Sequence, residues 1–223
     1  MTEPSELWPP FGLTVRSGDL TMSAVTDDDL PGLVDLVRSG IHEPDLMPFV
    51  YPWTRVAPDK VAQSFAAHHW SERAAFGPDH VSVDLAVRVD GELVGTQGFA
   101  GGPFGITRTA ETGSWLAQRH QGRGIGTRMR QAVCTLLLDH LGAAEVTSTA
   151  FVDNPRSLGV SRRVGYRQGD VVRLAREGRL ALSQRLVLRP EDLVRGEPVE
   201  VSGAEPLQRF LGLDRSGQEA GTA

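Results

Sequence analysis

The residues best suited to chemistry form one short glycine-rich stretch, Gln121-Gly122-Arg123-Gly124-Ile125-Gly126-Thr127. A strand-like run precedes this stretch and a long amphipathic run follows it, so the glycines would lie where a strand enters a helix. Backbone amides at a helix N-terminus point outward without partners, and the helix dipole there favours an anion. Because glycine carries no Cβ, a diphosphate can approach its backbone closely. The stretch therefore predicts a phosphate-binding turn.

Arginines surround this turn. The chain has no acidic residue from 112 to 138, and this segment contains four arginines: Arg119, Arg123, Arg128 and Arg130. A second patch contains Arg156, Arg162, Arg163 and Arg167. The whole chain is nevertheless acidic, with 23 basic and 28 acidic residues and a net charge of −5. Two cationic patches on an acidic protein indicate a polyphosphate ligand; the alternative is a glycine turn that serves helix packing alone.

Other motifs that bind nucleotides or carry nucleophiles do not fit. A dinucleotide fingerprint needs Gly-x-Gly-x-x-Gly, and the last position is Thr127 here. A Walker A loop needs a Gly-Lys pair, and the only lysine is Lys60. Ser114 is followed by Trp115 and Leu116, so it is not the serine of a Gly-x-Ser-x-Gly elbow.

Composition excludes further classes. The single cysteine, Cys134, rules out an internal disulfide and a multi-cysteine zinc site, and the six histidines lack metal-ligand spacing. Net negative charge argues against a nucleic-acid partner. The sequence has no apolar run of the ~18–20 residues that span a bilayer and no signal-peptide pattern, so we expect a cytoplasmic protein without a membrane partner.

The elements that must position the turn follow from periodicity. A chain of 223 residues suffices for one core with extensions, and we divide it into an N-terminal arm (1–12), a domain (13–188) and a C-terminal tail (189–223) with one short helix near 207–211. The predicted strands cover residues 20–25, 81–89, 92–99, 111–116, 146–152, 171–175 and 180–188. The predicted helices begin near residues 30, 59, 124 and 154, and the last ends at Gly165. This order predicts an α/β sheet domain with mixed strand pairing.

With these elements in order, Gln121-x-x-Gly124-x-Gly126 resembles the Q/R-x-x-G-x-G/A signature of the GNAT superfamily of acyl-CoA-dependent N-acyltransferases. Gly113-Ser114-Trp115-Leu116 before the turn, and Asn154-Pro155-Arg156-Ser157 with Gly165-Tyr166 after it, are similar to the RimJ/RimL-type branch. The resemblance covers residues 20–188. It implies the GNAT fold, a mixed, mostly antiparallel central sheet of about seven strands flanked by about four helices.

The resemblance implies an acyl-CoA co-substrate, most simply acetyl-CoA, although a longer acyl group such as succinyl also fits, and no metal. The backbone of Trp115, Leu116 and Ala117 would pair with the pantetheine arm. The signature residue Gln121 and the amides of Gly122, Arg123, Gly124, Ile125, Gly126 and Thr127 would hold the pyrophosphate. Asn154 and Ser157 would line the pantetheine side, and Arg163 would lie near the 3′-phosphate. Alternatively, Asn154 is an ordinary helix cap and Arg163 a solvated charge.

Two catalytic roles follow from the same resemblance: a base for the acceptor ammonium and a donor for the leaving thiolate. Ser161 stands seven residues after Asn154, where many family members carry a tyrosine, and could bond to the sulfur. Its alternative is a surface serine bonded to the carbonyl one turn back. Glu111 stands near the family's catalytic glutamate; its alternative is a strand-edge carboxylate paired with an arginine such as Arg108.

The acceptor would be a primary amine, either a protein N-terminal α-amine or a small molecule. We expect the proline-rich segment 41–56 to line its pocket, because this segment is too aromatic for an idle loop. Its candidate residues are His42, Met47, Phe49, Tyr51 and Trp53, although His42 could be a loop histidine without a role. A homodimer is compatible with this scheme. The rival functions are a silent acyl-CoA-binding sensor or assembly module and a nucleotide-binding protein that ATP or NAD would occupy.

Overall fold

The computed structural model describes residues 2–213, which form one nine-stranded sheet with helices on both faces. The strands lie in the order β7-β8-β6-β5-β4-β3-β2-β1-β9, and every neighbouring pair is antiparallel except β5 and β6. Their bounds are β1 Thr14–Ser17, β2 Leu20–Ala24, β3 Val81–Val89, β4 Glu92–Gly101, β5 Thr109–Leu116, β6 Glu145–Phe151, β7 Arg167–Arg176, β8 Arg179–Leu188 and β9 Glu200–Ser202.

Seven α-helices accompany the sheet in the described residues: α1 Pro4–Leu7, α2 Leu30–Arg38, α3 Val61–Ala75, α4 Phe104–Thr107, α5 Ile125–Thr135, α6 Pro155–Val164 and α7 Ala204–Phe210. A π-helical turn over Leu136–His140 extends α5. The predicted mixed, mostly antiparallel sheet is confirmed, and its strands differ from the predicted seven by β1 and β9. These have four and three residues, which is too short for alternation to stand out in the sequence.

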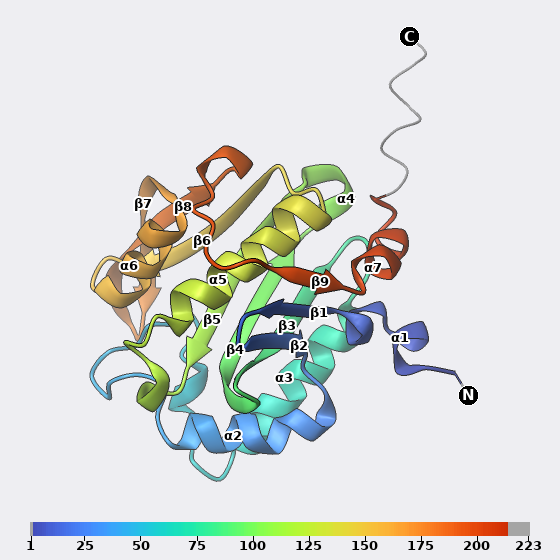
Figure 1. The fold of residues 1–223 in the computed structure, drawn as a ribbon. Coiled ribbons are helices and arrows are strands. Elements are labelled where there is room, and N and C mark those ends of the chain that lie inside the picture. Colours follow the sequence, from blue (N-terminus) through green and yellow to red (C-terminus); the bar gives the residue numbers. More distant parts are fainter. Residues whose placement is uncertain (1, 214–223) are drawn as a thin grey trace.

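The two faces of the sheet carry different helices. Alternation along β3 places Val83 and Leu85 against α5, within the main hydrophobic core. Ala86 belongs instead to a second cluster with Leu33 of α2 and Phe65 of α3. Figure 1 shows α5 crossing the front of the sheet, so α2 and α3 cover the opposite face. One sheet therefore separates two compartments, the α5 face and the α3 face.

Strands β5 and β6 separate part-way along their length. Their parallel pairing is limited to three residue pairs, the last of which is Glu111 with Thr147. Two side-chain bonds lie beside this last pair, since Thr112 Oγ1 donates to Thr147 O and Ser148 Oγ donates to Thr112 O. From residue 113 to its end, β5 does not pair with β6, so its backbone borders an opening on that side.

Both ends of the described chain pack against the domain. In residues 1–12, Trp8 and Phe11 contact the main core, and the guanidinium of Arg73 lies 5.1 Å from the Phe11 ring. In residues 189–213, β9 pairs with β1 (Figure 1), and Leu207 is fully buried in the main core. The segments predicted as an arm and a tail therefore contribute packed elements; residues 214–223 of that tail lie outside the described residues. No helix among residues 2–213 combines the length and the apolar character needed to cross a bilayer.

Candidate active site

The glycine turn adopts the backbone that its sequence predicts. Gly122 and Gly124 have φ angles of 76° and 80°, in the left-handed region that favours glycine, and α5 begins at the next residue, Ile125. Nothing lies within 4 Å of a Cβ built on either glycine, so the turn faces open space. The amides of Gly122, Arg123 and Gly124 donate to no acceptor among residues 2–213. The turn thus offers free N–H groups at the positive end of an eleven-residue helix and fits a pyrophosphate.

Only part of the predicted cationic patch is available to a phosphate. Arg128 pairs with Asp19 and Glu197. Arg130 is buried between α5 and the sheet. Arg119 bonds to Ser39 and lies near Glu92. Arg123 and Arg163 are exposed and form no ion pair within the described residues. The two arginines predicted nearest to the phosphates are therefore exposed and outside ion pairs within the described residues, as is Arg162 beside Arg163.

Gln121 connects three segments. Its Nε2 donates to Ile41 O at 2.8 Å and to Leu116 O at 2.9 Å, and its Oε1 accepts from Arg156 Nη1 at 2.9 Å. These bonds join the proline-rich segment 41–56, the end of β5 and the first turn of α6. The resemblance assigns Gln121 to the cofactor, whereas in this structure its side chain holds the three surrounding segments together.

On α6 the predicted residues have different surroundings. Asn154 Oδ1 accepts from the Ser157 amide at 3.1 Å, so the helix-cap alternative is realised. Ser161 is 0% exposed, and its hydroxyl has no hydrogen-bond partner among the described residues. It is therefore neither a surface serine nor bonded to the carbonyl one turn back. The hydroxyl is sealed in the core in this structure.

The α3 face contains a cleft of about 890 Å³. Its walls come from α3, the 49–56 segment and strands β3 to β5, and its floor includes Gly98 and Gly113. These glycines lie in register with Asp84 across three strands, which leaves space over the sheet beside the separation of β5 and β6. The cleft lining includes two carboxylates, two histidines and six Phe, Tyr or Trp side chains but no arginine or lysine: Asp84, Glu111, His68, His69, Phe49, Tyr51, Trp53, Phe65, Phe99, Trp115 and smaller residues.

Three of the five residues predicted for the acceptor pocket line this cleft: Phe49, Tyr51 and Trp53. The rings of Trp53 and Trp115 lie 6.2 Å apart, so the proline-rich segment 41–56 packs on the end of β5. His42 and Met47 are not part of the lining.

Those two residues secure the segment instead. His42 bonds to Glu43 O and to Thr54 Oγ1 within it. Met47 is buried, and its carbonyl accepts from Arg176 at 3.3 Å. Arg55 bonds in turn to Glu177 at 2.9 Å, which ties the segment to the β7–β8 turn.

The residues predicted to border the pantetheine arm occupy the end of β5. Trp115 lines the cleft. Leu116 and Ala117 are buried, and the carbonyl of Leu116 is already bonded to Gln121. The Ala117 amide donates to Val94 O on the β4 side. The strand is thus held from β4, while its other edge borders the opening.

Glu111 is exposed in the cleft. Its Oε1 accepts from Thr149 Oγ1 at 3.2 Å, and it forms no ion pair with any residue from 2 to 213. Arg108, the arginine suggested as its partner, donates to Leu141 O instead. The strand-edge ion pair is therefore absent from the described residues, and the carboxylate faces the space that an acceptor would enter.

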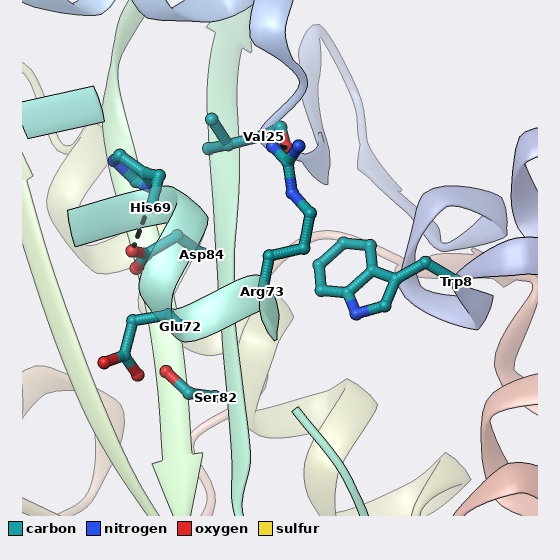
Figure 2. Close-up of a pocket in the computed structure, with 7 residues that line it drawn as sticks. All are labelled: Trp8, Val25, His69, Glu72, Arg73, Ser82 and Asp84. Carbon is teal, nitrogen blue, oxygen red and sulfur yellow. Dashed lines mark hydrogen bonds and ion pairs between the residues drawn. The ribbon is translucent and has the colours of Figure 1, made fainter. Parts of the chain in front are cut away.

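A histidine and an aspartate lie deeper in the cleft, and the sequence alone does not single them out. His69 of α3 is 7% exposed, and its Nδ1 lies 3.5 Å from Asp84 Oδ2 on β3. Figure 2 shows the two side chains side by side, joined by a dashed line. Burial lowers the pKa of His69, and the nearby Asp84 carboxylate opposes this shift. Their proximity depends on α3 packing over β3, a long-range contact that no local spacing predicts. No cluster of three His, Cys, Asp or Glu residues suited to a metal ion occurs in residues 2–213.

The model of the acetyltransferase (GNAT) domain matches residues 19–167. The chain belongs to the GNAT family. It is an acyl-CoA-dependent N-acyltransferase of the GNAT type.

Solved GNAT structures share its fold at low identity. RimJ from Mycobacterium smegmatis in complex with a CoA-disulfide superposes with a TM-score of 0.71 at 19% identity, over 90% of this chain and 94% of that one. RimL, a ribosomal L7/L12 α-N-protein acetyltransferase in complex with CoA, gives 0.64 at 19%, over 78% and 95%. The Vibrio cholerae spermidine N-acetyltransferase in complex with CoA and spermine gives 0.62 at 16%, over 78% and 97%.

Proposed function

We propose that this GNAT protein transfers an acyl group, most simply acetyl, from CoA to a primary amine by direct attack within a ternary complex. The observation that carries the proposal is the cleft on the α3 face, which reaches the separation of β5 and β6 while the glycine turn lies at the start of α5. An amine and a thioester could thus approach the same opening from different sides. No covalent enzyme intermediate is needed.

The charge of the cleft supports a cationic acceptor. Its lining contains Asp84 and Glu111 but neither arginine nor lysine, although 23 such residues occur in the chain. An ammonium would be attracted electrostatically, and the rings of Tyr51, Trp53 and Trp115 add a surface for cation–π contact. The same two carboxylates would repel an anionic acceptor. Protein N-terminal α-amines and polyamines, the acceptors named for RimL and the spermidine enzyme, both satisfy this requirement.

On the donor side, the free amides of the turn and the exposed Arg123 would bind the pyrophosphate, and Arg163 the 3′-phosphate. Ser157 and the Asn154 side-chain amide nitrogen would border the pantetheine arm along α6. Glu111 would accept the ammonium proton, either directly or through a water molecule.

The base matters most for a strongly basic amine. A lysine-like amine with a pKa of ≈ 10.4 is neutral in about one molecule in 2,500 at pH 7, a deficit near 4.6 kcal/mol. For an α-amine with a pKa near 7.8 the deficit is only about 1 kcal/mol. The acceptor class therefore determines how much Glu111 contributes.

The test is release of CoA when acetyl-CoA and succinyl-CoA are each offered with a panel of peptide α-amines, polyamines and matched carboxylate-bearing amines. Turnover with the cationic acceptors, and less with the anionic ones, is the expected result. Tight acyl-CoA binding without turnover across the panel would instead indicate a sensor. Displacement of CoA by ATP or NAD at equal concentration would indicate a nucleotide site.

A further inference from the structure

Arg130, on the second turn of α5, is a buried cation without an anionic partner. It is 4% exposed, and its guanidinium donates to Gln97 Oε1 at 3.2 Å, to Ser148 Oγ at 3.1 Å and to Ser114 Oγ at 2.9 Å. All three acceptors are neutral, and Arg130 has no ion pair within residues 2–213. Burying a charge is costly unless an opposite charge accompanies it. An anion is therefore the ligand that this position lacks.

The three partners place the guanidinium under the separation of β5 and β6. Gln97 lies on β4, Ser114 on β5 and Ser148 on β6. Strand pairing ends at Glu111 and Thr147, so Ser114 and Ser148 stand on opposite sides of the opening, near its narrow end. Ser114 also lines the cleft. Arg130 thus reaches the opening from the α5 face, opposite the face from which an acceptor would enter.

The proposed function supplies an anion at this place, and the inference rests on it. With the pyrophosphate on the glycine turn at the wide end, the pantetheine arm leads its sulfur toward the narrow end. We propose that the Arg130 guanidinium contacts this sulfur and stabilises the thiolate as it leaves.

In that step the amine nitrogen bonds to the thioester carbonyl carbon and the carbon–sulfur bond breaks. The electron pair of the broken bond stays on sulfur, and the amine proton passes to Glu111 or water. The products are an amide and the CoA thiolate.

The guanidinium has hydrogen-bond capacity left for this contact. It carries five N–H donors, and its three bonds use one each on Nε, Nη1 and Nη2. Each terminal nitrogen therefore keeps one N–H. The alternative donor, the hydroxyl of Ser161, is sealed in the core.

Little stabilisation is needed at this sulfur. A thiol with a pKa of about 8.5 is disfavoured as thiolate by only about thirtyfold at pH 7. A fixed cation in a water-poor site can offset that factor without transferring a proton.

The titration of the CoA thiol can be followed only if neighbouring groups do not ionise in the same pH range. Glu111 lies on the cleft side, and Cys134 and Tyr166 lie together on the α5 face, where Tyr166 bonds to Thr112. Burial raises the pKa of the Cys134 thiol to about 11 and raises the pKa of Tyr166 as well. Since Cys134 is the only cysteine, the CoA thiol is the one thiol of the complex expected to ionise below pH 10, and the difference in ultraviolet absorbance between the CoA and desulfo-CoA complexes follows it.

The experiment is a pH titration of that absorbance for CoA bound to the wild-type protein, to Arg130→Lys and to Arg130→Met. We expect the pKa of the bound thiol to lie at least one unit below that of free CoA in the wild type. Arg130→Lys should keep part of the shift and Arg130→Met none. Acyl transfer should fall tenfold to a hundredfold in Arg130→Met at an unchanged KM for the acceptor.

Desulfo-CoA, which lacks the sulfur, is the control for an intact site, and its affinity should change less than threefold in both variants. A bound thiol with the pKa of free CoA in the wild type would overturn the inference without any variant. An equal shift in Arg130→Met would do the same, since Arg130 would then only join three strands. Failure of the wild type to bind either CoA or desulfo-CoA would overturn the proposed function as well.

Discussion

The two faces of the central sheet differ in charge and in how their residues come together. On the α5 face, the glycine turn and the unpaired Arg123 belong to one continuous segment at a helix start. On the α3 face, the cleft collects Asp84, Glu111 and His69 from β3, β5 and α3. A phosphate site can be built from local backbone, whereas a site for an ammonium needs carboxylates spaced across several strands. In the proposed reaction, one sheet would thus keep the phosphates of CoA and the ammonium of the acceptor apart until the two substrates meet at its opening.

Of the substitutions on the two faces, Gly124→Val on the α5 face should have the largest effect. The β-branched side chain disfavours the left-handed backbone at φ 80° and fills the open space in front of the turn. We expect CoA affinity to fall by more than about a hundredfold, measured by calorimetry. The matched control is Gly91→Val, because Gly91 has φ 81° and open surroundings in the remote β3–β4 turn. Equal CoA affinity in the two folded variants would show that the turn does not bind the cofactor.

On the opposite face, Glu111→Gln should leave CoA affinity unchanged but lower kcat/KM by roughly a hundredfold near neutral pH. Raising the pH should restore part of the loss because solvent then deprotonates the amine. A polyamine acceptor should show a larger deficit than an N-terminal peptide. Parallel pH profiles for the variant and the wild type, within a factor of three, would assign deprotonation to water or another group.

Substitutions of Arg123 and Arg163 should distinguish the pyrophosphate from the 3′-phosphate, with a smaller effect. An exposed charge–phosphate contact contributes on the order of 1 kcal/mol, or about fivefold in affinity. Arg123→Ala should weaken CoA and dephospho-CoA alike, whereas Arg163→Ala should weaken CoA alone. Arg162→Ala, an exposed neighbour on α6, is the control. Equal losses for both ligands in both variants would contradict this assignment of the phosphates.

The smallest effect should be a pH dependence of stability from His69. Burial lowers the pKa of His69 in the folded protein, so the unfolded chain, with a pKa near 6.5, binds more protons. This contribution to stability is complete above that value and is lost as pH falls toward the folded pKa. Thermal unfolding between pH 7 and pH 5 should therefore lose less stability in His69→Gln than in the wild type. His68→Gln, its exposed neighbour, should follow the wild type.

The extent to which the sequence predicts this molecule depends on the range of each interaction. The break between the strands predicted at 81–89 and 92–99, the end of α6 at Gly165 and the turn at Gly124 are set by neighbours in the chain, and the structure contains all three. The role of Gln121 was harder to predict, because its bonds to Ile41 and Arg156 span 80 and 35 residues.

The surroundings of the arginines on α5 were also not predictable from the sequence. Arg128 and Arg130 stand in the same basic run as Arg123, yet one pairs with Asp19 and the other is buried under β5. Identical residue types two positions apart on a helix point in different directions. Only the packed sheet distinguishes them.

The pairing of β9 with β1 has a consequence for the order in which the chain folds. Arg16 lies opposite Glu200, so the first strand of the sheet obtains its outer neighbour only from residues near the end of the described chain. During synthesis β1 leaves the ribosome long before that neighbour does, and until then its outer backbone groups form an exposed edge that other chains can pair with. Contacts of such long sequence separation also slow folding, because the intervening loop must close first. Protection of β1 amides in pulsed hydrogen exchange should therefore appear late, together with that of Leu207, after the β3–β4 hairpin is already protected.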